Sequence, residues 1–138
     1  MTLHSCPRMP EQEFIEVLAS WYFPPESVSV MAARTQTMEL LAELEIEHTF
    51  EAQAIVDELA ANAVVHAKTE FEVAIERWRG GIRIIVRDCS ELEPAMQTPD
   101  LLAESGRGLF MIDGFADSWG YHPTEQGKCI WADLIVNF

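Results

Sequence analysis

Two polar side chains interrupt the apolar face of one predicted helix and a third lies beside it, within the stretch DELAANAVVHA. Leu59, Asn62 and His66 follow helical spacing and share a stripe whose earlier positions are apolar. Glu58 precedes Asn62 by four residues and lies beside that stripe. A carboxylate, an amide and an imidazole in one patch could bind a polar ligand, because a buried polar group without a partner costs roughly 1–3 kcal/mol. Exposure of this helix face to solvent is the alternative.

Two further stretches place polar groups where a ligand could meet them. In IRIIVRD, Asp88 ends an apolar row and is either an acceptor at the mouth of a pocket or the start of a turn. In SGRGLFMIDG, Gly106 and Gly108 flank Arg107 directly before a helical pattern. Glycines let backbone N–H groups approach an anion, and a helix N-terminus favours negative charge. Such a pair of glycines can also only turn the chain, and it matches neither the Rossmann pattern nor the P-loop.

The elements that must position these residues follow from hydrophobic patterning. In chain order, we expect a strand (14–23), two helices (27–46 and 49–67), two strands (70–78 and 82–88), a long loop (89–108), a short helix (108–119) and a final hairpin that turns at 124–128. A loop of this length in a small domain is usually a functional lid or disordered. This order predicts an N-terminal arm (1–13) and one α+β domain (14–138), a two-layer sandwich whose mostly antiparallel, mixed sheet is covered on one face by helices.

Composition excludes several classes of function. The chain has 138 residues, a net charge of −14 and only nine basic residues, which are scattered, so a nucleic-acid-binding surface is not expected. No apolar run is long enough to span a membrane. The three cysteines (Cys6, Cys89 and Cys129) have no CxxC spacing, which argues against a disulfide framework or a zinc site. The start lacks a signal-peptide pattern, so we expect a cytoplasmic location.

Four stretches that occur in a fixed order indicate a family more specifically together than any one of them does alone. DELAANAVVHA, VRDCSELEP, ESGRGLFMIDGFADSWG and GKCIWADL resemble the boxes of the GHKL ATPase superfamily, which has the Bergerat ATP-binding fold and includes gyrase and histidine-kinase catalytic domains. Within it, the chain resembles the small stand-alone bacterial serine/threonine kinases of the anti-sigma-factor type over residues 14–138.

The resemblance implies a role for each matching residue. Glu58 would be the general base, Asn62 the Mg²⁺ ligand, and His66 a neighbour of the nucleotide phosphates. Asp88 matches the aspartate that accepts the adenine amino group. The other implied nucleotide-binding positions are Ser90, Gly106, Arg107, Gly108, Leu109 and Cys129. Two departures from the family pattern stand out. The loop after Asp88 lacks the glycines of the fuller superfamily pattern, although the short family often has serine there. Cys129 stands where relatives commonly have threonine, and because a thiol is a poor hydrogen-bond partner, this departure implies weaker ATP binding.

The function implied by the resemblance is that of an ATP- and Mg²⁺-dependent serine/threonine protein kinase. It would phosphorylate a small antagonist protein, bind a sigma factor and switch between the two partners, with no direct contact to nucleic acid or membrane; homodimer formation is left open. The alternative is an inactive or weakly active nucleotide-binding module that sequesters a protein partner. A plain α+β domain without nucleotide is the third interpretation.

Overall fold

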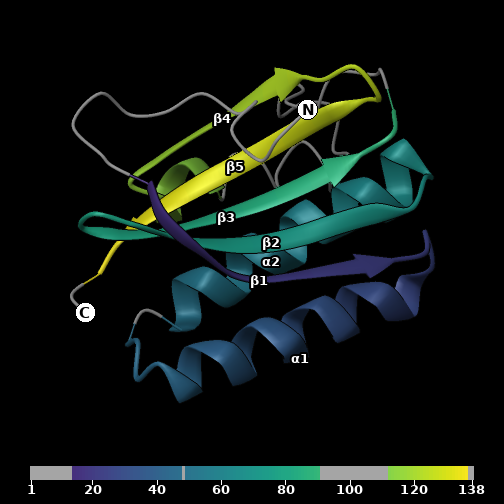
Figure 1. Cartoon of the computed structure of the whole chain (residues 1–138). Coiled ribbons are helices and arrows are strands. Elements are labelled where there is room, and N and C mark those ends of the chain that lie inside the picture. Colours follow the sequence, from purple (N-terminus) through teal and green to yellow (C-terminus); the bar gives the residue numbers. More distant parts are fainter. Residues whose placement is uncertain (1–13, 48, 91–111, 137–138) are drawn as a thin grey trace.

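The computed structural model describes residues 14–47, 49–90 and 112–136 (Figure 1). Its elements confirm the predicted order: β1 (Phe14–Phe23), α1 (Ser27–Glu43), α2 (Thr49–Asn62), a π-helical segment η2 (Ala63–Ala67), β2 (Phe71–Trp78), β3 (Gly81–Asp88), β4 (Ser118–Pro123) and β5 (Lys128–Ile135). The predicted helix 27–46 ends at Glu43. Only 112–115 are helical in the described part of the predicted helix 108–119, because Ser118 and Trp119 already belong to β4.

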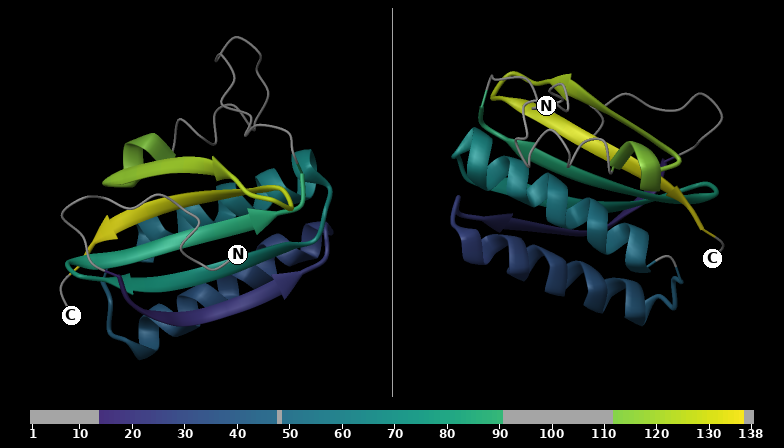
Figure 2. Two further views of the ribbon diagram at one scale, coloured as in Figure 1. Left: turned by 45° about the horizontal axis from the view of Figure 1, so that its top comes forward. Right: turned by 180° about the vertical axis from the view of Figure 1, so that it is seen from behind.

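One sheet and two helices form the two layers. The strands lie in the order β1-β2-β3-β5-β4, and every pair in it is antiparallel. The expected α+β sandwich is therefore confirmed, but the sheet of the described residues is antiparallel throughout rather than mixed. Figures 1 and 2 show α1 and α2 on the same face of this sheet. None of the described helices is long and apolar enough to cross a membrane.

The main core lies between the helices and the facing side chains of the sheet. Ile82, Ile84 and Val86 alternate along β3 and join Ile55 and Leu59 of α2 in one buried cluster. This is the period-two and helical patterning that the sequence predicted. Because the helix stripe and the strand row are buried against each other, the polar residues that end both rows are brought to the same end of the domain.

The other face of the sheet carries a buried charged cluster that the sequence did not indicate. Arg83 pairs with Asp133 through two hydrogen bonds, Nε to Oδ1 at 2.7 Å and Nη2 to Oδ2 at 3.0 Å. The Arg83 guanidinium also lies over the rings of Trp78 and Trp131, at 4.2 and 4.3 Å from their centroids. Glu76 is 1% exposed and accepts a hydrogen bond from Trp78 Nε1. Both faces of the central strands are therefore buried.

Candidate functional site

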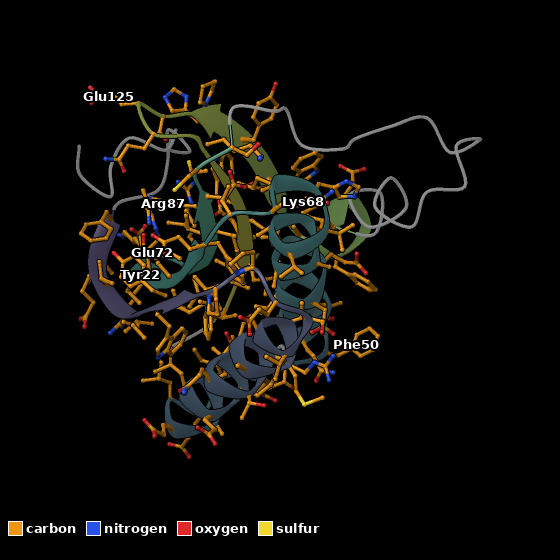
Figure 3. All side chains as sticks on the ribbon, turned by 90° about the vertical axis from the view of Figure 1, so that its right-hand side faces the viewer. Tyr22, Phe50, Lys68, Glu72, Arg87 and Glu125 are labelled. Carbon is orange, nitrogen blue, oxygen red and sulfur yellow. The ribbon has the colours of Figure 1, made fainter. Side chains whose placement is uncertain are left out.

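Polar residues gather at the end of the sheet where the helical segment η2, the end of β3 and the start of β5 meet. Figure 3 looks onto this end, with Lys68 at the end of the helical segment. Lys68 has a left-handed conformation (φ 57°), and its N–H donates to the Ala63 carbonyl at 2.8 Å, which ends the helix. Asp88, the last residue of β3, lies directly opposite Lys128, the first residue of β5.

The helix that carries the predicted residues is not α-helical to its end. From Ala63 to Ala67 it has π-helical geometry, where the sequence predicted a continuous α-helix. A π-helical turn holds one more residue than an α-helical turn, so it shifts the direction of the side chains that follow. Such turns occur frequently at functional sites. His66 lies in this turn, one turn after Asn62.

Two buried polar atoms of this helix have no hydrogen-bond partner among the described residues: Asn62 Nδ2 and His66 Nε2. Asn62 is 7% exposed, so the alternative in which this face turns to solvent is wrong for Asn62. Glu58 lies half-buried one turn before Asn62. Because an unsatisfied buried group costs roughly 1–3 kcal/mol, a polar ligand that reached the two atoms would remove this cost.

The imidazole of His66 is held in its neutral form. Burial lowers the pKa of His66 below its ordinary value of 6.5, and the positive charges of Lys128 and Lys68 lower this pKa further. A neutral imidazole has one N–H donor and one bare nitrogen acceptor. His66 therefore adds a polar group without adding positive charge.

The carboxylate of Asp88 is engaged by an ammonium group that the sequence analysis did not single out. Lys128 Nζ lies 2.9 Å from Asp88 Oδ2 and 3.1 Å from Oδ1, and the Ser90 N–H donates to Oδ1 at 2.9 Å. The side chains of Asp88 and Lys128 are only 3% and 8% exposed. The pairing depends on the register between β3 and β5, which the sequence alone does not give.

Gly127 fixes the backbone beside this pair. A Cβ atom at Gly127 would lie 2.1 Å from the Asp88 carbonyl oxygen and 2.6 Å from the Cα of Cys89. The absence of a side chain therefore lets the hairpin turn approach the end of β3. The Gly127 N–H also donates to Thr124 Oγ1 at 3.0 Å, which closes the turn.

The remaining predicted residues divide into two groups. Ser90 is buried beside Asp88, and Cys129 is fully buried in β5. Cys129 is disulfide-bonded, whereas Cys89 is free and exposed. Because disulfides are rare in a reducing cytoplasm, the cytoplasmic location stays a prediction. Gly106, Arg107, Gly108, Leu109 and most of the predicted lid lie outside the described residues.

The sequence of residues 23–134 matches the histidine kinase-like ATPase domain model. The chain belongs to the histidine kinase-like ATPase domain family. The crystal structure of the RsbU and RsbW domains of Rv1364c from Mycobacterium tuberculosis has a similar fold, with a TM-score of 0.66 and 16% sequence identity. The match covers 86% of this chain but 32% of that one, so the chain spans about a third of that protein's length. No curated protein is similar to the chain in sequence.

Some of the described residues have groups that could bond to the ATP implied by this family. ATP offers phosphate oxygens as acceptors for the unpartnered Asn62 Nδ2, and its base amino group could bond to the Asp88 carboxylate only where Lys128 leaves room for it. No group of three or more His, Cys, Asp or Glu side chains in the described ranges could hold a metal ion by itself. Mg²⁺ commonly takes one or two protein ligands and completes its coordination with phosphates and water. The lack of a three-residue cluster in the described ranges is therefore compatible with Mg²⁺ that is bound together with ATP.

Proposed function

We propose that the chain is an ATP- and Mg²⁺-dependent serine/threonine protein kinase of the anti-sigma-factor type. It phosphorylates a small antagonist protein and binds a sigma factor, and its phosphorylation of the antagonist switches it between the two partners. The observation that carries the proposal is the pair of unpartnered buried atoms, Asn62 Nδ2 and His66 Nε2, at the same end of the fold as Asp88. The family match over residues 23–134 and the fold shared with a structure that includes an RsbW domain support it.

In this proposal each residue has a distinct part. Asp88 accepts the amino group of the adenine base. A turn of the Asn62 amide exchanges its nitrogen and oxygen, so this side chain can donate to a phosphate or present its oxygen to Mg²⁺. Neutral His66 hydrogen-bonds near the phosphates. Bound Mg²⁺ would offset the phosphate charge in a chain whose own net charge is −14.

Glu58 would act on the reacting hydroxyl of the protein substrate. The half-buried carboxylate lies on the helix that carries Asn62, one turn earlier, and would orient the hydroxyl or accept its proton. In the proposal, the predicted box at Gly106, Arg107, Gly108 and Leu109 supplies backbone N–H groups to the phosphates.

The experiment measures transfer of labelled phosphate from ATP to candidate antagonist proteins. Glu58→Gln should leave ATP binding nearly intact and abolish transfer, because the base acts in the transition state and not on bound ATP. Glu51→Gln is the matched control, since it makes the same chemical change in the first turn of the same helix. A Glu58→Gln protein that transfers phosphate at the wild-type rate would remove Glu58 from the proposed role.

A second function remains supported by one observation, the engagement of Asp88 by Lys128. If that carboxylate never accepts a base, the chain would sequester a protein partner without phosphorylating anything. Two results separate the functions: the sequestering module binds its partner with the same affinity whether or not ATP is present, and no labelled phosphate appears on the partner.

A further inference from the structure

Asp88, the carboxylate proposed to accept the adenine base, already accepts nearly as many hydrogen bonds as it can. Lys128 Nζ bonds to both Asp88 oxygens and the Ser90 N–H bonds to one of them. A carboxylate has about four lone-pair sites, so about one is left. Only 3% of the Asp88 side chain is exposed, and the two groups that bond to its oxygens come from β5 and from the residues after β3. A base amino group therefore has no open approach while Lys128 stays in place.

We propose that Lys128 is a lock on the base-accepting carboxylate, which must release Asp88 before a purine amino group can bind there. The inference rests on the proposed role of Asp88 and adds a residue that sets the affinity of that site. An ammonium–carboxylate hydrogen bond is charge-assisted and stronger than the bond from a neutral amino group. Exchanging the lysine bond for a bond from the base amino group therefore costs free energy. Lys128 thus lowers the affinity of this site for the base.

The phosphates of the nucleotide can offset part of that loss. The positive charge of Lys128 lowers the pKa of His66, so the ammonium lies close enough to the helix end to act on it electrostatically. Phosphates placed near His66 would attract the ammonium once it leaves Asp88. Adenosine has no phosphates and offers no such compensation. The lock should therefore oppose adenosine more strongly than it opposes ATP.

The test compares adenosine and ATP affinities by titration calorimetry in wild type and Lys128→Met. Methionine keeps an apolar stem of similar length in β5 and removes the ammonium. We expect adenosine to bind at least about tenfold more tightly to the variant, with a smaller gain for ATP. Lys68→Met is the matched control: Lys68 also lowers the pKa of His66 but is exposed and has no described bond to Asp88. Its adenosine affinity should equal that of wild type.

Lys128→Met leaves the Asp88 carboxylate buried without a counter-charge, so this variant can fail to fold. Lys128→Arg keeps the charge and can pair with both carboxylate oxygens, so it should fold and bind adenosine no better than wild type. In wild type, the side-chain ammonium signal of Lys128 in proton–nitrogen NMR spectra should shift when adenosine saturates the protein, whereas the Lys68 signal should not.

Three results would overturn the lock: an adenosine affinity of Lys128→Met at or below wild type, tighter binding by Lys128→Arg, or an unchanged Lys128 signal at saturating adenosine. If any of these occurs while wild type binds ATP and Asp88→Asn weakens that binding, the proposed function stands and the lock alone is wrong. If wild type and every variant fail to bind both adenosine and ATP, the proposed function fails together with the lock.

Discussion

Replacing Asn62 with alanine should stabilise the free protein while weakening its affinity for ATP–Mg²⁺. Asn62 is 7% exposed and its Nδ2 has no hydrogen-bond partner in the described chain, which costs roughly 1–3 kcal/mol. Alanine also has a higher helix propensity, worth up to about 0.7 kcal/mol. The lost packing of the amide offsets part of this gain. We therefore expect a net stabilisation of about 1 kcal/mol, or about 4 °C in Tm for a domain of this size.

Thr37→Ala provides the control for this prediction. Thr37 is likewise a buried polar residue in a helix, but its Oγ1 donates to the Ala33 carbonyl at 2.8 Å. Removing a satisfied buried group should cost about 1 kcal/mol and leave ATP affinity unchanged. Urea unfolding without nucleotide gives the free energies of unfolding, and calorimetry with ATP–Mg²⁺ gives the affinities.

The two measurements on Asn62→Ala can refute the reasoning independently. A variant clearly less stable than wild type would mean that the amide supports the fold and is not kept unpaired for a ligand. A variant that binds ATP–Mg²⁺ with wild-type affinity would mean that the amide does not contact nucleotide or metal.

His66 and two glycines give further predictions. Because the pKa of His66 is lowered in the folded state, protonation of His66 favours the unfolded state, and the folded state loses stability as the pH falls through 6.5 toward the lowered pKa. The free energy of unfolding of His66→Gln, measured by urea unfolding, should therefore fall less than that of wild type between about pH 7.5 and about pH 5.5. An equal fall in the two proteins would contradict this. Gly127→Ala and Gly81→Ala should both lower Tm, because their Cβ atoms would lie 2.1 Å from the carbonyl oxygens of Asp88 and Leu134. Calorimetry at a temperature below both Tm values should show weaker ATP binding for Gly127→Ala alone. An equal loss of ATP affinity in the two variants would argue against a local effect at Asp88.

Much of the sheet and the main core follows from local patterns. The alternation of Ile82, Ile84 and Val86 predicted the face of β3 that packs on the helices. The two strands predicted at 70–78 and 82–88 are neighbours in the sheet as β2 and β3, and Gly80 between them has the positive φ (92°) that favours glycine. Such features were predictable because each depends on residues close together in the chain.

Features that depend on register or on helix geometry were not predictable. The pairs Asp88–Lys128 and Arg83–Asp133 join residues 40 and 50 positions apart, and each requires β3 and β5 to be aligned residue by residue. The π-helical turn after Asn62 carries no distinctive residue, since AVVHA suits an α-helix as well. The sequence therefore predicted that Asn62 and Asp88 carry chemistry, but not that Asp88 is paired.

The central claim is that Asp88 accepts the base of a bound nucleotide at the end of β3. The measurement that tests it most directly is titration calorimetry of ATP–Mg²⁺ with wild type and Asp88→Asn, both shown to be folded by circular dichroism. An amide presents an N–H₂ donor beside its acceptor and lacks the charge of the carboxylate. We predict that wild type binds and that Asp88→Asn binds at least about tenfold more weakly, a difference of about 1.4 kcal/mol. Equal affinities of the two proteins would contradict the claim and remove Asp88 from the site.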